Sequence, residues 1–154
     1  MLDAYLSSDC SCNPLLMIGR VEPWILSRYG AQSSIEFAGA MSQLELFQKV
    51  EKCRYGICHL PLRRPYCYQT PTKLLEYAAL HRGILANEHP SARSTAERLG
   101  IHVNWLANDV FSGADPDSWH SGNPSFDSRS IGWTRVIGES GIEHRIASIL
   151  DSKG

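Results

Sequence analysis

Short apolar runs alternate along the chain with stretches of helical spacing, and this alternation constrains the fold more than any other feature. The apolar runs lie at 15–19, 35–39, 55–60, 84–86 and 101–106. Helical spacing separates them at 42–52, from Thr70 onward and over 91–99. Strands that alternate with helices are typical of βαβ units, which build a mostly parallel sheet. The sequence therefore predicts an α/β fold with three layers and a Rossmann-like sheet of about five strands.

Two of the expected helices carry recognisable start signals. Ser42 with Glu45 three residues later forms the pattern of a capping box. Thr70 followed by Pro71 predicts a helix with threonine as its cap and proline in its first turn, where a missing N–H is tolerated. The stretch 107–125 is rich in Gly, Pro, Asp and Ser and is predicted to be a loop, whereas 130–154 has the pattern of a helix.

Size and charge limit the protein classes that fit. The 154 residues suffice for one domain with a core of its own. Lysine and arginine number 15 against 16 acidic residues, which argues against a chain held on nucleic-acid phosphates. No apolar stretch approaches the roughly 18 residues of a membrane span, and the amino-terminal residues lack the pattern of a signal peptide. We therefore expect a cytoplasmic protein without a membrane span and without nucleic acid as a partner.

The sequence lacks the common motifs of metal, cofactor and nucleotide-binding loops. The five cysteines are odd in number and do not form two C-x2-C pairs, and the six histidines lack H-x3-H spacing. We expect free thiols, no metal site and no cofactor. The fingerprints G-x-S-x-G, G-x4-G-K-[ST] and G-x-G-x-x-G are also missing from the sequence. Trp105, Trp119 and Trp133 are interpreted as packing residues.

The segment 66–86 carries the most informative chemistry. A loop here leaves the carboxyl end of a strand and enters a helix, whose free N–H groups and dipole favour a phosphate. Lys73 lies in the first turn, where a cation opposes the dipole, so it is a candidate anion contact. Glu76 on the same helix could accept hydrogen bonds from a ribose diol. The alternative interpretation is an ordinary amphipathic helix with Lys73 and Glu76 as a solvated pair.

The same segment resembles the retaining group-1 (family four) glycosyltransferases, which have two Rossmann-like domains. Their pattern is close to P-x-K-x-x-E-Y-M-A-x-G-x-P-V-I, and this chain matches it in register at Pro71, Lys73, Glu76, Tyr77 and Ala79. It departs where the pattern has Gly and Pro, since His81 and Gly83 stand there instead. The run LLMIG and the later runs IEFAG and YGICHLP follow the family's order of strands. The resemblance covers roughly residues 15 to 150.

The resemblance implies that the whole chain, 1–154, is a single donor-binding domain for a nucleoside-diphosphate sugar, with the acceptor domain absent. Transfer would be retaining, metal-free and directed to an acceptor glycan or lipid-linked sugar, in the cytoplasm or peripheral to the inner face of the membrane. The implied nucleotide-sugar-binding residues are Tyr68, Thr70, Pro71, Thr72, Lys73 and Glu76. Arg20, Arg63 and Arg64 are candidate phosphate contacts. Glu76 matches the second Glu of the family's Glu-x7-Glu pair, while the first falls at the non-acidic Tyr68. Catalytic residues are not predicted.

Arg20 raises a question of register. The family's donor domain begins with a strand that ends in Gly-Arg, and Gly19-Arg20 resembles it. Yet the stretch from Arg20 to Ile35 is too short for the helix, strand and second helix that would follow. We therefore interpret LLMIG as the second strand and LDAYLSSD as the end of the preceding helix. The first strand, with its phosphate-binding Arg and Lys, is then expected before Met1, and Arg20 is a solvated residue.

Two other function classes remain open at this point. A non-catalytic nucleotide or phosphate-binding module, or a degenerate relative of the family, is favoured slightly by Tyr68, His81 and Gly83. An interaction domain of the receiver or flavodoxin-like type would need acidic residues after its first strand, which Gly19-Arg20 does not provide.

Overall fold

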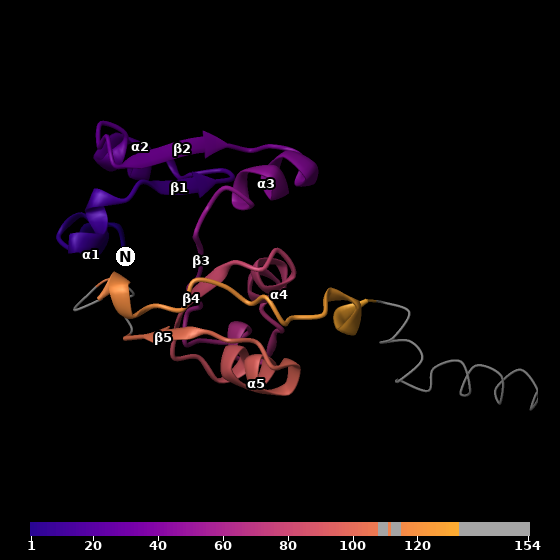
Figure 1. The fold of residues 1–154 in the computed structure, drawn as a ribbon. Coiled ribbons are helices and arrows are strands. Elements are labelled where there is room, and N and C mark those ends of the chain that lie inside the picture. Colours follow the sequence, from indigo (N-terminus) through magenta and orange to yellow (C-terminus); the bar gives the residue numbers. More distant parts are fainter. Residues whose placement is uncertain (108–110, 112–114, 133–154) are drawn as a thin grey trace, which may run out of the picture.

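A computed structural model describes residues 1–107, 111 and 115–132 of the chain (Figure 1). Its strands are β1 (Leu15–Ile18), β2 (Ile35–Gly39), β3 (Tyr55–Cys58), β4 (Gly83–Asn87) and β5 (Asn104–Leu106). Its α-helices are α1 (Leu2–Leu6), α2 (Pro23–Tyr29), α3 (Gln43–Val50), α4 (Thr72–Ala79) and α5 (Pro90–Leu99). Short 3-10 helices lie at Asp9–Cys12, Tyr66–Tyr68, Pro116–Ser118 and Ser128–Ile131. The predicted α/β class is confirmed.

The strands form two parallel sheets. β1 pairs with β2, with Leu15 opposite Ile35. The second sheet has the order β3-β4-β5, and its register sets Tyr55 opposite Gly83 and Leu85 opposite Asn104. Every pairing within the described residues is parallel, as the βαβ pattern predicts. The sheet is divided between β1 and β3 (Figure 1).

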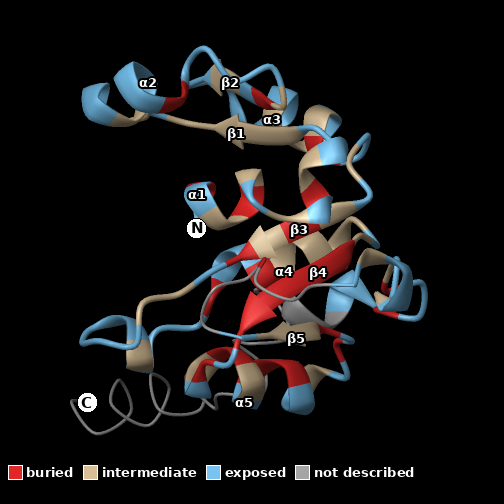
Figure 2. Ribbon diagram, turned by 90° about the vertical axis from the view of Figure 1, so that its left-hand side faces the viewer, coloured by how far each residue is buried: buried red, intermediate tan, exposed pale blue. Residues whose placement is uncertain are grey.

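The core lies on both faces of β4, whose five residues are all buried (Figure 2). Ile84 and Ala86 face one way, into a cluster that includes Leu74 of α4 and Ala92 of α5. Leu85 faces the other way, into a second cluster that holds residues of α1, β1 and β3. Helices therefore cover both faces of this sheet, which gives the three layers expected.

The structure confirms the predicted start of α3 and corrects the predicted start of α4. Ser42 caps α3: its Oγ accepts a hydrogen bond from the Glu45 N–H at 3.3 Å, and the Glu45 carboxylate accepts from the Ser42 N–H at 2.9 Å. The hydrogen bond with the Ser42 side chain lowers the pKa of Glu45. The prediction that Thr70 caps α4 is wrong. Pro71 itself is the cap residue, because its extended backbone, with ψ of 96°, delays the helix to Thr72.

Other boundaries differ modestly from the expectation. The helix α2 was not predicted, although Pro23 stands in its first turn. β5 starts later than expected, because the His102 N–H donates to Oδ1 of Asn123 at 2.7 Å rather than to a neighbouring strand. Residues 133–154 lie outside the described part of the chain, and with them most of the predicted terminal helix and Trp133. Among the described helices, none has the length and apolar character needed to cross a membrane.

Candidate functional site

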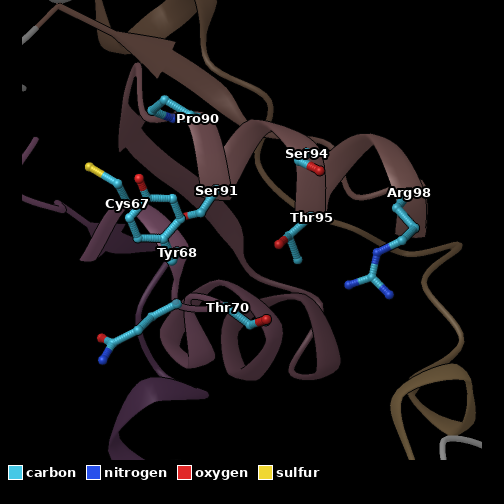
Figure 3. Close-up of a pocket in the computed structure, with 9 residues that line it drawn as sticks. Cys67, Tyr68, Thr70, Pro90, Ser91, Ser94, Thr95 and Arg98 are labelled. Carbon is cyan, nitrogen blue, oxygen red and sulfur yellow. The ribbon is translucent and has the colours of Figure 1, made fainter. Parts of the chain in front are cut away.

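A pocket of about 340 Å³ lies between the loop after β3 and helix α5 (Figure 3). That volume falls near the lower end of the range usual for small-molecule sites. One wall comes from the loop that enters α4, and the other from one face of α5. The lining residues are Cys67, Tyr68, Gln69, Thr70, Pro90, Ser91, Ser94, Thr95 and Arg98.

Two contacts hold the loop against the rest of the fold. Asn87, at the end of β4, is only 3% exposed. Its Oδ1 accepts from the Leu60 N–H and its Nδ2 donates to the Leu60 carbonyl, each at 2.9 Å. Further along, Ser91 Oγ of α5 donates to the Tyr66 carbonyl at 3.4 Å. The pocket is thus tied to the carboxyl ends of neighbouring parallel strands, which is where ligands bind in open α/β sheets.

The amino end of α5 forms part of the pocket wall. His89 is its cap residue and makes no capping hydrogen bond with its side chain, and Pro90 follows in the first turn. The Nδ1 atom of His89 lies 2.9 Å from Ser91 Oγ, which fixes the position of that hydroxyl group. The Nε2 atom of His89 is buried without a hydrogen-bond partner in the described part of the chain. The first N–H groups of α5 and the helix dipole favour negative charge at this end.

The pocket has positive character. Arg98 is the one charged group among its nine lining residues. The guanidinium of Arg64 lies 5.6 Å from the ring centre of Tyr68, and that of Arg63 lies 6.0 Å from the ring of Tyr66. Both arginines belong to the loop that forms one wall, although neither lines the pocket itself. Tyr68 is 74% exposed, so the rest of its ring surface is open to a ligand.

The helix α4 presents its predicted binding residues outside this pocket. Lys73 is exposed and Glu76 is half-buried. Within the described part of the chain, the side chains of Lys73 and Glu76 form no hydrogen bond or ion pair, so the two are not paired with each other. Pro71 is buried and Thr72 is exposed. Of the predicted nucleotide-sugar residues, the structure brings Tyr68 and Thr70 together in the pocket and leaves those of α4 beside it.

Close packing fixes the position of α4 on the sheet. A Cβ atom added at Gly56 of β3 would lie 2.4 Å from the ring of Tyr77. The glycine therefore lets the tyrosine ring lie directly on the strand. Burial raises the pKa of Tyr77 to about 12 and that of the neighbouring Cys58 thiol to about 11. Both groups stay protonated at neutral pH, so their role here is packing.

A residue just after α4 has a backbone conformation that favours glycine. His81 stands where the pattern has glycine, and it is the one non-glycine residue of the described chain with a positive φ, 56°. Glycine adopts this left-handed backbone at little cost and is common just after helices. The Nδ1 atom of His81 lies 2.8 Å from the Asn123 carbonyl, a contact that holds the imidazole in place. The pattern and the backbone thus agree at this position.

Sequence reasoning missed the residues that α5 contributes. Ser91, Ser94, Thr95 and Arg98 line one face of the helix, with the spacing S-x-x-S-T-x-x-R. That spacing of three and four residues was the available signal. Arg20, in contrast, is exposed just after β1 and does not line the pocket.

A second pocket, of about 350 Å³, lies beside α1 and α2. Its charged residues are Asp3 and Arg28, which bind each other at 3.0 Å. Because this arginine is already neutralised, the pocket is a poorer site for an anion than the one beside α5. In the part of the chain that the structure describes, no cluster of His, Cys, Asp and Glu side chains is suited to a metal ion.

Comparison of the chain with protein-family models, curated proteins and solved structures gives no match. These comparisons therefore do not test the resemblance to glycosyltransferases, which stays a prediction.

Proposed function

We propose that this chain is the donor-binding part of a retaining glycosyltransferase and that it holds a nucleoside-diphosphate sugar in the pocket beside α5. The observation that carries the proposal is the position of Tyr68 and Thr70. Both were predicted from the family resemblance, and both line a pocket that contains an arginine and no carboxylate. The left-handed backbone of His81, at the family's glycine position, supports the same resemblance.

Each part of the ligand has a suitable partner. The hydroxyl group of Thr70, with Arg98, offers donors to phosphate oxygens. The exposed ring of Tyr68 offers a surface on which a base can stack. Glu76, outside the pocket, is proposed on the resemblance alone to accept hydrogen bonds from the ribose. Stabilisation of the leaving diphosphate by these donors is the contribution to transfer that we assign to this chain.

The remaining parts of the reaction belong to an acceptor-binding domain. We expect that domain to present a glycan or a lipid-linked sugar to the donor. The proposal places the protein in the cytoplasm, or peripheral to the inner face of the membrane, where such acceptors are glycosylated. Polysaccharide biosynthesis is the process that fits this chemistry.

A thermal-shift series with uridine, guanosine and adenosine diphosphates tests the proposal. One nucleotide should raise the unfolding midpoint, since a ligand at 100 times its Kd adds about 2.7 kcal/mol to the stability of the folded state. Glu76→Ala should weaken binding of that nucleotide by roughly 10- to 150-fold, because a ribose hydrogen bond to a carboxylate is lost. Inorganic diphosphate, which has no ribose, should bind equally to both proteins.

Glu97→Ala is the matched control, because Glu97 is exposed on α5 and does not line the pocket. If Glu76→Ala binds the nucleotide as the wild type does, the ribose role is wrong while donor binding stands. If no nucleoside diphosphate shifts the midpoint even at millimolar concentration, donor binding itself is wrong.

A further inference from the structure

The break between the two sheets lies between one edge of β1 and one edge of β3. β1 pairs with β2 on one edge, and β3 pairs with β4 on one edge. On their other edges neither strand pairs with another strand of the described chain. Open edges of apolar strands attract further strands, and proteins usually cover them.

Backbone geometry identifies the groups on these open edges. The N–H groups of Leu15 and Gly19 donate to the Ser34 and Gly39 carbonyls at 2.8 Å, so alternate residues of β1 face β2. The N–H and C=O groups of Leu16 and Ile18 therefore face the opposite edge. In β3, the Arg54 carbonyl accepts from the Gly83 N–H at 3.2 Å.

The backbone groups of successive strand residues point to opposite edges, so those of Tyr55 and Ile57 point away from β4. Each of the two strands thus has two residues whose backbone N–H and C=O groups face the break and pair with no strand of the described chain.

The side chains of β1 are typical of a strand in the buried middle of a sheet. All four of its residues are apolar, a pattern typical of strands buried on both faces of a parallel sheet. Yet all four are only half-buried here. Leu16 and Ile18 belong to neither of the two core clusters.

The order of the strands indicates which strand would fit between β1 and β3. Doubly wound sheets have the order 3-2-1-4-5-6. The observed order is β2-β1, a break, then β3-β4-β5, which is the same order without its first strand. The connection from β2 to β3 through α3 crosses the break. The amino terminus and α1 lie between the two sheets, next to the break (Figures 1 and 2).

We propose that the position between β1 and β3 receives a parallel strand of about five apolar residues, whose chain continues into α1. Consecutive strands of a parallel sheet usually lie side by side. Since β2 occupies one edge of β1, a strand that precedes α1 would lie on the open edge. The added strand would pair with Leu16 and Ile18 on one side and with Tyr55 and Ile57 on the other.

Amide hydrogen exchange tests the proposal directly. A five-residue Val/Ile strand and a short linker are fused ahead of Met1, and exchange is compared with that of the 154-residue chain. The amides of Leu16, Ile18, Tyr55 and Ile57 should exchange at least about tenfold more slowly in the fusion. The matched control is the same extension with proline at alternate positions, which cannot donate to the ladder and should give no such protection.

Two results would overturn the inference. One is slow exchange of the Leu16 and Ile18 amides in the 154-residue chain itself, as slow as that of the paired Met17, because the edge would then be closed already. The other is a fusion that leaves these amides unprotected, or that protects them equally with proline. Neither result bears on nucleotide binding, which the proposed function tests separately.

Discussion

His81 has a backbone conformation that glycine adopts more easily than histidine does. It follows α4 with φ of 56°, a region that costs a residue with a Cβ roughly 1–2 kcal/mol. Its imidazole contact with the Asn123 carbonyl, at 2.8 Å, offsets part of this cost. The residue therefore occupies a glycine position with the help of a compensating side chain.

A pair of substitutions separates the backbone from the side chain. His81→Gly and His81→Ala both lose the contact with Asn123, but only glycine is relaxed at a positive φ. We expect His81→Gly to be more stable than His81→Ala by about 1 kcal/mol in urea denaturation.

The control is the same pair of substitutions at Glu97, an exposed position inside α5. There the alanine variant should be more stable than the glycine variant by about 0.8–1 kcal/mol. An alanine variant at position 81 that equals or exceeds the glycine variant in stability would show that the backbone there is unstrained.

At the scale of elements, the contact between β3 and α4 sets the geometry beside the pocket. Gly56→Ala would push a methyl group into the Tyr77 ring, which lies 2.4 Å from the added atom. We expect a loss of about 1–3 kcal/mol in the free energy of unfolding, measured by urea denaturation.

Combining it with Tyr77→Leu, which removes the ring, should cost less than the sum of the two single changes. Additive losses would mean that the ring is not what the methyl group meets.

Sequence reasoning succeeded where local chemistry decides the structure. Ser42 and Glu45 specify their capping box within one helical turn, and the apolar runs specify strands. It failed at Thr70, because the extended backbone of Pro71 delays the helix start to Thr72. It also missed α2, whose seven residues are too few for a clear period.

The site was predictable in part for a similar reason. Tyr68 and Thr70 belong to one continuous segment, which the family pattern covers. Ser91 and Arg98 reach the same pocket from another helix, and only the packing of α5 against the loop reveals this. Such a contact depends on tertiary structure, which a single sequence does not specify.

At the scale of the whole molecule, the pocket and the break in the sheet are separate features. The pocket is built entirely from residues that follow β3, on the half of the fold made by β3, β4 and β5. The break lies between this half and the β1–β2 pair. Nucleotide binding and strand addition can therefore be measured independently on the same protein.

The central claim is that the pocket beside α5 binds a nucleoside diphosphate. Mapping backbone amide shifts by NMR, during titration with uridine, guanosine or adenosine diphosphate, tests it most directly. We predict that one nucleotide moves the signals of Tyr68, Thr70, Ser91 and Arg98 together along a single saturable curve, and that Arg98→Ala weakens this response while Arg28→Ala in the other pocket does not. Shifts confined to the second pocket around Arg28, or no saturable shift with any of the three nucleotides, would contradict the account.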